Sequence, residues 1–277
     1  TVPRTVLMGC GNQLTNNYFN RYQGSLVYFH PLLILLCMHV NLFIPCFVDQ
    51  LYPQTAFNMI KVLKKAGCTV HYNTEQTCCG QPAYNAGYWD ECRSVAEKFV
   101  RDFEGNEYIV APSGSCTGFV RNYYDKVLED TGNQTQIHHQ QLPVYEFTEF
   151  LTTVLNVEDI GAEFKASAVY HDACGALREC GIKDAPRKLL RHVKGLQLIE
   201  APDCEVCCGF GGTFAVKFEP ISIGMGEQKV LNAIEMGAEY LISTDLSCLL
   251  HLDGYIRKHN YLLKTAHIVD VLACGWK

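Results

Sequence analysis

Positive charge is not concentrated anywhere in the sequence. The chain carries 23 Lys and Arg against 29 Asp and Glu in 277 residues, which gives a formal net charge of -6. A surface without a basic patch has no general attraction for phosphate backbones or anionic lipid. We therefore expect no nucleic-acid partner.

An apolar run long enough to cross a membrane is also absent. In the nearest candidate, "LVYFHPLLILLC" (26–37), His30 and Pro31 interrupt the run, and it falls short of the roughly 20 residues that a span requires. No small-residue cleavage pattern of a signal peptide follows it. We expect no integral membrane span. We also expect residues 1–37 to be an N-terminal extension outside the working fold, with Met38 as a natural start.

Motifs for nucleotide cofactors are missing as well. "GCGNQL" and "GMGEQK" lack the third glycine of a dinucleotide-binding loop, and the chain has no Walker A lysine. Without a flavin or nicotinamide site, the chain has no evident means of accepting a hydride by itself. A role as an oxidoreductase subunit would therefore require a complex with other proteins.

Cysteine, by contrast, is abundant. The chain has 15 Cys, and its 48% hydrophobic residues are enough to build a core without disulfide staples. Cys-Cys-Gly occurs twice, in "TCCGQPAYNAG" (77–87) and "VCCGFGGTFAVK" (206–217), where composition alone predicts about 0.06 such triplets. Clustering of this kind indicates metal or redox chemistry in a reducing compartment. We expect a cytoplasmic protein with reduced thiols.

The two triplets belong to an internal repeat. When they are aligned, "EYIVAPSGSC" (107–116) faces "EYLISTDLSC" (239–248), and both copies begin with an apolar run that ends in cysteine, "VNLFIPC" and "ASAVYHDAC". A repeat unit of this length predicts two similar domains, because a solenoid needs more and shorter units. We expect a first module over residues 38–155 and a second over residues 160–277.

Strands and helices are expected to alternate within each copy. "VNLFIPC", "TVHYN", "YIVAPS" and "YLISTDLS" are typical of strands. "PQTAFNMIKVLKKAG" carries Phe57, Ile60 and Leu63 at helical spacing and stops at Gly67, a usual cap. "VYEFTEFLTTVL" (144–155) is expected to be a helix that joins the copies. The alternation predicts an α/β fold of two pseudo-symmetric modules with mainly parallel strands, each with a Cys-Cys-Gly turn.

Each copy supplies four cysteines at equivalent positions: one after the first strand, two in the Cys-Cys-Gly turn and one after the last strand. They are Cys46, Cys78, Cys79 and Cys116 in the first copy, and Cys174, Cys207, Cys208 and Cys248 in the second. These positions meet at the carboxyl edge of a parallel sheet, where ligands bind. Gly80 and Gly209 permit the turn that brings both cysteines of a pair to one site. Four thiolates suit zinc or an iron-sulfur cluster, although the long ligand spacing is unlike a zinc ribbon.

The spacing C-x31-CCG-x35-C, repeated as C-x32-CCG-x38-C, resembles the duplicated cysteine-rich CCG domain found in heterodisulfide reductase and in the glycolate oxidase iron-sulfur subunit. "CCGQPAYNAG", "PSGSC", "CCGFGGTFAVK" and "SCLL" are more similar to the lactate utilization protein A family, over residues 38 to about 272. The resemblance implies an iron-sulfur electron-transfer subunit of a cytosolic L-lactate oxidation complex with two companion subunits. A glycolate oxidase or heterodisulfide reductase-like complex, and a zinc-bound scaffolding subunit, are the alternatives.

The sequence departs from the heterodisulfide reductase relatives at one position of each copy. Those relatives end each copy in C-x-x-C, whereas here Phe119 and His251 stand at the fifth cysteine. The loss of a fifth thiolate favours a four-cysteine site for a 4Fe-4S cluster, with one or two clusters in the chain. The resemblance also allows zinc in one of the two sites.

Three residues near the expected ligands are candidates for a supporting role. Cys204 lies three residues before Cys207 and is a candidate spare ligand, or else a bystander. His171 and His251 could donate a hydrogen bond to a cluster sulfur, or be ordinary surface or core histidines. The cysteines without a repeat partner are expected to be small buried hydrophobes. They are Cys10, Cys37, Cys68, Cys92, Cys180 and Cys274.

"GSCTG" also resembles the nucleophile elbow of an α/β hydrolase, with Cys116 as the nucleophile. His138, His139 or His267 could serve as the base. The matching segment "DLSCLLH" keeps Cys248 but lacks both glycines, as expected if metal ligation is the shared requirement. A cysteine hydrolase is therefore a remote alternative.

Overall fold

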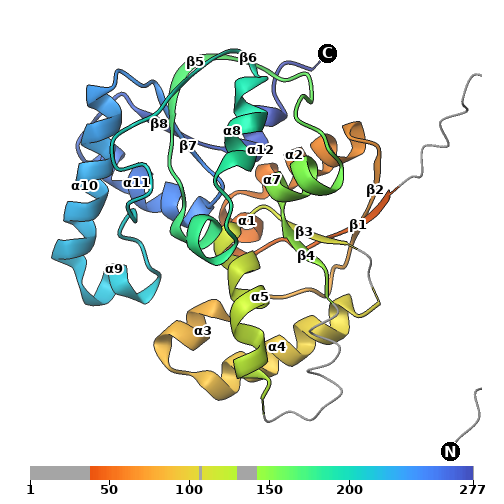
Figure 1. The fold of residues 1–277 in the computed structure, drawn as a ribbon. Coiled ribbons are helices and arrows are strands. Elements are labelled where there is room, and N and C mark those ends of the chain that lie inside the picture. The colour runs from red at the N-terminus through yellow and green to blue at the C-terminus, as the bar shows by residue number, and fades with distance from the viewer. Residues whose placement is uncertain (1–37, 106–107, 130–141, 277) are drawn as a thin grey trace, which may run out of the picture. The chain divides into compact units, whose positions relative to one another are not determined.

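The computed structural model describes residues 38–105, 108–129 and 142–276; the expected extension lies outside them. Two four-stranded sheets, parallel throughout, form the framework of this part (Figure 1). Their strand orders are equivalent, β2-β1-β3-β4 and β6-β5-β7-β8. The strands are β1 (Met38–Leu42), β2 (Cys68–Tyr72), β3 (Ile109–Ala111), β4 (Val144–Glu146), β5 (Glu163–Tyr170), β6 (Lys194–Ile199), β7 (Tyr240–Ser243) and β8 (Lys264–His267). The predicted α/β fold with two parallel-stranded modules is confirmed.

Helices connect the strands in both modules. The first module contains α1 (Cys46–Leu51), α2 (Pro53–Lys65), α3 (Gln81–Ala86), α4 (Trp89–Phe103), α5 (Gly114–Val127), α7 (Phe147–Glu149) and the π-helical turn η1 (Phe150–Val154). The second contains the π-helical turn η2 (Gly175–Glu179), α8 (Asp184–Arg191), α9 (Thr213–Lys217), α10 (Glu219–Glu235), α11 (Leu246–Lys258) and α12 (Ile268–Leu272). Within the described ranges, none of the helices has the length and apolar character that a membrane crossing needs.

The sequence of α2 explains its limits. Pro53 occupies the first helical position, where its missing N–H costs no hydrogen bond, and the helix ends just before Gly67, which has a φ of 92°. Met59 and Leu63 face the core. Phe57, expected among the periodic apolar residues, is 59% exposed, because two residues correspond to about 200° around a helix and place it opposite Met59.

Two expectations about the elements are wrong. Residues 144–155 do not form one helix: β4 occupies their start, and α7 and η1 follow it. Each module also has a fourth strand, β4 or β8, so Cys116 and Cys248 follow the third strand of a module and not the last. Strands of three and four residues leave too short a pattern to be distinguished from the helices beside them.

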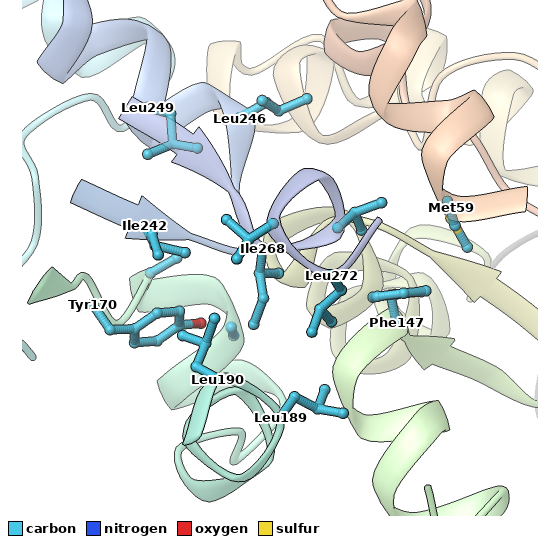
Figure 2. Close-up of a cluster of buried hydrophobic side chains, with 14 of the residues drawn as sticks. Met59, Phe147, Tyr170, Leu189, Leu190, Ile242, Leu246, Leu249, Ile268 and Leu272 are labelled. Carbon is cyan, nitrogen blue, oxygen red and sulfur yellow. The ribbon is translucent and has the colours of Figure 1, made fainter. Parts of the chain in front are cut away.

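One cluster of buried side chains extends through both modules (Figure 2). Met59 of α2 and Phe147 of α7 belong to the same cluster as Leu189 of α8, Ile242 of β7 and Leu272 of α12. A second cluster, drawn mainly from β3, α4 and α5, belongs to the first module alone. Because the larger cluster is shared, the two modules bury much of their apolar surface against each other.

The modules contact each other through equivalent elements. α5, which follows β3, contacts η2, which follows β5; α11, which follows β7, contacts α1, which follows β1. In the same way α12 contacts α2, and α7 contacts α8. Each contact between a helix of the first module and a helix of the second is repeated by the equivalent helices with the two modules exchanged. The modules are therefore related by a pseudo-twofold axis.

The α5 and η2 contact brings two backbones very close together. A Cβ atom on Gly114 would lie 2.4 Å from the Cβ of Ala176, and one on Gly175 would lie 2.5 Å from the Cα of Ser115. Both distances are shorter than any ordinary contact, so only glycine fits at these two positions. The helix that carries Cys116 is thereby held against the turn that follows Cys174.

Candidate metal centre

The eight cysteines expected as ligands line one cavity of about 600 Å³. Cys46 opens α1 shortly after β1, and Cys174 directly precedes η2 after β5. The two Cys-Cys pairs follow β2 and β6, while Cys116 and Cys248 lie in the first turns of α5 and α11. All eight therefore lie beyond the carboxyl ends of strands, the edge at which parallel α/β sheets bind ligands. The structure joins the two expected sets at a single cavity.

The two Cys-Cys-Gly turns have the same local geometry. Gly80 has a φ of 90° and Gly209 a φ of 92°, the left-handed region that favours glycine. In each turn the glycine N–H donates to the sulfur two residues earlier, Cys78 Sγ or Cys207 Sγ, at 3.4 Å. A backbone N–H directed at sulfur favours the thiolate over the thiol.

The second cysteine of each pair is buried, and its turn is fixed from behind. Cys79 and Cys208 are each 1% exposed. Tyr124 Oη donates to the Cys79 carbonyl at 2.8 Å, and Ser222 Oγ donates to the carbonyl of Gly209 at 2.7 Å. Both turns are thus anchored to a helix of their own module.

The thiols of a module lie close enough to affect one another. Cys46 Sγ donates to Cys78 Sγ at 3.8 Å. Hydrogen bonds from Cys46 and from Cys79 lower the pKa of Cys78, and Cys174 and Cys208 lower the pKa of Cys207 in the same way. One thiol of each set therefore gives up its proton readily, which prepares the site for a cation.

The donor set fits a thiolate-bound metal centre. Two thiolates on one tetrahedral zinc ion are separated by about 3.8 Å, given zinc-sulfur bonds of about 2.3 Å, and the sulfurs of Cys46 and Cys78 have this separation. Four-thiolate sets also hold iron-sulfur clusters, and the cavity in front of the cysteines has room for one. None of the 13 cysteines in the described ranges is in a disulfide, so all eight sulfurs are available as ligands.

Asp245 links the two cysteine-bearing helices. It immediately precedes α11, but its carboxylate accepts hydrogen bonds from the N-terminus of α5: Ser113 Oγ at 2.8 Å, Ser115 Oγ at 2.7 Å and the Ser115 N–H at 2.9 Å. Ser113 Oγ in turn accepts from the Cys116 N–H at 3.3 Å. The positions of Cys116 and Cys248 are therefore coupled. The cysteine pattern does not point to Asp245; the signal in the sequence is its alignment with Ser113 in the repeat, which puts a polar residue before a helix in both copies.

A buried ion pair includes Asp172, two residues before Cys174. Arg187 is bidentate to Asp172, with bonds of 2.8 and 2.7 Å, and also bonds Glu200. Hydrogen bonds and ion pairs of this kind hold a segment in one conformation when all their groups are satisfied. Cys204 contacts the same arginine, with Arg187 Nη2 at 3.9 Å from its sulfur, and does not line the cavity.

The two histidines named as candidates have different surroundings. His251 Nε2 lies 3.2 Å from the Ser222 carbonyl and 3.4 Å from its hydroxyl. His171 is buried, and one of its ring nitrogens lies within 4.8 Å of the sulfurs of Cys208 and Cys248. Burial lowers the pKa of His171 to about 3, so its ring is neutral and keeps a lone pair.

The hydrolase alternative gains no support. Cys116 does follow a strand and open a helix, but His267 Nδ1 accepts from the Val269 N–H at 3.2 Å and thereby caps α12. Within the described ranges no hydrogen bond joins Cys116 to a histidine. His138 and His139 lie outside those ranges.

The cysteines that have no counterpart in the repeat meet their expectation in part. Cys68 and Cys92 are buried as expected. Cys180 and Cys274 are only half-buried, and their sulfurs donate to the carbonyls of Gly114 and Asp270, at 3.5 and 3.2 Å. Cys10 and Cys37 lie outside the described residues.

Comparison with known proteins agrees with this geometry. The family model described as CCG, cysteine-rich domain, matches residues 40–121 and again residues 168–253. A crystal structure of a hypothetical protein from Helicobacter pylori has a TM-score of 0.55 and 12% identity over 86% of this chain and 49% of its own, which supports the fold alone. The fold and the paired cysteine sets thus define a protein with a duplicated CCG cysteine-rich domain.

Relatives of similar length show to which family within this class the chain belongs. Lactate utilization protein A from Anoxybacillus flavithermus is 41% identical over 235 residues, which cover 85% of this chain and 99% of that protein. Lactate utilization protein A 1 from Bacillus mycoides is 42% identical over 245 residues, 85% of this chain and 96% of that protein. The chain belongs to the lactate utilization protein A family.

Proposed function

We propose that this chain is an iron-sulfur electron-transfer subunit of a cytoplasmic L-lactate oxidation complex. The observation that supports it best is the convergence of eight cysteines, four from each module, on one cavity. The names of relatives at about 40% identity indicate lactate as the substrate. When bound, a 4Fe-4S cluster supplies the transfer of one electron at a time.

The chain's own residues would hold such centres in a defined environment. Cys46, Cys78, Cys79 and Cys116 are the proposed ligands in the first module, and Cys174, Cys207, Cys208 and Cys248 in the second. The glycine N–H groups of both turns donate to ligand sulfurs, and hydrogen bonds of this kind are among the features that set a reduction potential. Asp245 keeps Cys116 and Cys248 in register across the module boundary.

Companion subunits follow from what the reaction requires. Oxidation of lactate removes two electrons and two protons, and the sequence contains no recognisable flavin or nicotinamide motif to accept a hydride. We therefore propose that two companion subunits supply the donor-side chemistry and the exit to an acceptor. In this arrangement the chain is an intermediate carrier.

The proposal is tested with protein purified under anaerobic conditions. We expect broad absorption near about 400 nm that dithionite bleaches, as thiolate-bound iron-sulfur centres show. The isolated chain should not reduce an artificial acceptor with L-lactate. Activity should appear when the companion subunits are added, and glycolate in place of lactate tests the alternative donor.

Matched cysteine variants make the test specific. Cys78→Ser and Cys207→Ser should abolish the reconstituted rate while the complex still assembles. Cys274→Ser is the control, since that thiol donates to the Asp270 carbonyl and does not line the cavity. Lactate-dependent turnover by the isolated chain would contradict the proposal.

A zinc-bound scaffolding subunit is the second candidate. The 3.8 Å between Cys46 Sγ and Cys78 Sγ favours it, because this is the separation of two thiolates on one tetrahedral ion. The same experiment separates the two candidates. Colourless protein with stoichiometric zinc, together with full activity in a complex built from the Cys207→Ser variant, would establish the scaffold.

A further inference from the structure

The two modules differ at one buried position beside the cysteines. Phe43 precedes Cys46 by three residues, and His171 precedes Cys174 by three. The Phe43 N–H donates to the Val110 carbonyl at 3.0 Å, and the His171 N–H donates to the Ile242 carbonyl at 2.8 Å. Val110 of β3 and Ile242 of β7 are equivalent in the repeat, so the two side chains leave equivalent points of the fold.

In the first module this position is apolar. Phe43 is fully buried and packs edge-on against Phe99 and Phe103, with ring centroids 4.8 and 6.0 Å away. A phenyl ring offers no lone pair to a metal. The first site is therefore restricted to its four sulfurs.

In the second module the same position carries a polar ring without a partner. His171 is 2% exposed, and neither of its ring nitrogens has a hydrogen-bond partner among the described residues. The carbonyl of Cys204 lies near enough to raise the pKa of the ring, but it is not in hydrogen-bond geometry with either ring nitrogen. A buried donor and acceptor left without partners destabilises a fold, so such a group requires an explanation.

The surroundings of the ring supply that explanation. One ring nitrogen lies within 4.8 Å of Cys208 Sγ and Cys248 Sγ, two of the cysteines that line the cavity. A hydrogen bond from Ser243 Oγ to the His171 carbonyl, at 2.9 Å, fixes the residue against β7. The nitrogen is thus held beside two sulfur donors by the sheet itself.

We propose that His171 donates a ring nitrogen to the metal centre of the second module, so that the two modules hold inequivalent centres. The first is bound by sulfur alone and the second by sulfur and nitrogen. Mixed cysteine and histidine sets bind zinc, and in iron-sulfur centres histidine in place of cysteine raises the reduction potential. The inference concerns the donor set and applies to either metal, so it stands apart from the proposed electron-transfer role.

Three variants of the full chain test it. His171→Phe copies the residue of the first module, and His171→Cys replaces the nitrogen donor with a sulfur donor. His251→Gln is the matched control, because that ring already contacts Ser222. Because the four cysteines of the second module remain, as they do beside Phe43 in the first, we expect all three variants to retain both centres in competition with a chelator, and His171→Phe and His171→Cys to convert the second centre to ligation by sulfur alone.

The donor atom is identified by spectroscopy on protein labelled with ¹⁵N-histidine. Pulsed electron paramagnetic resonance is used on reduced protein if the metal is iron, and X-ray absorption at the zinc edge if it is zinc. We expect a histidine nitrogen signature in the wild type and in His251→Gln, but not in His171→Cys. A sulfur-only centre in the wild type, or a nitrogen signature that survives in His171→Cys, would overturn the inference.

Discussion

Buried polar residues at the module boundary have well-defined partners. Glu146, at the end of β4, accepts hydrogen bonds from the Thr148 N–H at 2.8 Å and the Glu149 N–H at 3.2 Å, and also from Thr244 Oγ1 of the second module. Burial raises the pKa of Glu146 to about 7 in spite of these donors. Part of the contact between modules therefore depends on pH.

The sign of this dependence follows from the two pKa values. Glu146 has a pKa of about 7 in the folded chain and an ordinary value of 4.5, so the folded state binds more protons between these values. The contribution of Glu146 to the free energy of unfolding should therefore fall as the pH rises from about 4.5 to 7, by at most about 3 kcal/mol. Glu146→Gln should remove this contribution, so its free energy of unfolding should fall less, or rise more, from pH 5 to pH 8 than that of the wild type, as measured by denaturant unfolding.

Glu91→Gln, on the exposed side of α4, is the control for that experiment and should keep the slope of the wild type. Identical slopes in the wild type and in Glu146→Gln would show that the carboxyl group does not titrate differently in the folded chain.

For single residues, the sequence predicts which residue types form the site better than it predicts where their side chains point. The eight cysteines could be identified because the same residues recur at nearly the same offsets in two copies. Whether His171 faces the cysteines could not be decided, because that depends on the register of β5 against β7. The role of Asp245 could not be predicted because the group that it binds, the N-terminus of α5, is 130 residues away in the sequence.

Among the elements, the Cys-Cys-Gly turn of the second module packs tightly against α10. Gly209 and Gly87 have nearly the same φ, 92° and 90°. A Cβ on Gly209 would lie 2.6 Å from the Ser222 carbonyl oxygen, whereas one on Gly87 would have nothing within 4 Å. Alanine substitutions at Gly87 and Gly209 therefore distinguish the cost of backbone strain, which both share, from the cost of a steric clash, which only Gly209 has.

We predict that Gly87→Ala costs about 1 kcal/mol, the usual penalty of a left-handed conformation for alanine. Gly209→Ala should cost clearly more and should also reduce metal in the second module, because the turn must move away from α10. Thermal unfolding and metal content per chain measure both effects. Equal losses in the two variants would mean that the turn has room to adjust.

A long helix could be predicted from the sequence, whereas the shortest strands could not. α2 has enough turns for apolar periodicity and end signals to agree. β4 has three residues, and its only strand partner among the described residues is β3, so its existence depends on a neighbour distant in sequence.

For the whole molecule, the shared core predicts that a module does not fold by itself. Met59 and Phe147 of the first module pack in one cluster with residues of α8 and α12, and separation would expose them to water. Residues 38–155 expressed alone should aggregate or bind a hydrophobic dye, in contrast to the full chain. Size-exclusion chromatography and circular dichroism would reveal the opposite result, a monomeric fragment that unfolds cooperatively.

The repeat in the sequence predicted two equivalent modules, but it could not predict how they meet. Equivalent residues show that two segments have the same fold, while the contacts of α5 with η2 and of α11 with α1 depend on surface shape. The close approach at Gly114 and Gly175 illustrates this, because only the assembled pair explains why both residues are glycine.

The pseudo-twofold axis also bears on the ancestry of the chain. Contacts between equivalent elements are what a symmetric homodimer forms, so duplication and fusion of the gene for such a dimer would produce this arrangement. Ser113 and Asp245 are equivalent in the repeat and bond each other directly, which places them at the axis. In a homodimer of either copy this pair would be two serines or two opposed carboxylates. Only after fusion could the residue of one copy change without the same change in the other. The hydrogen bond between the unlike residues Ser113 and Asp245 is a result of that divergence.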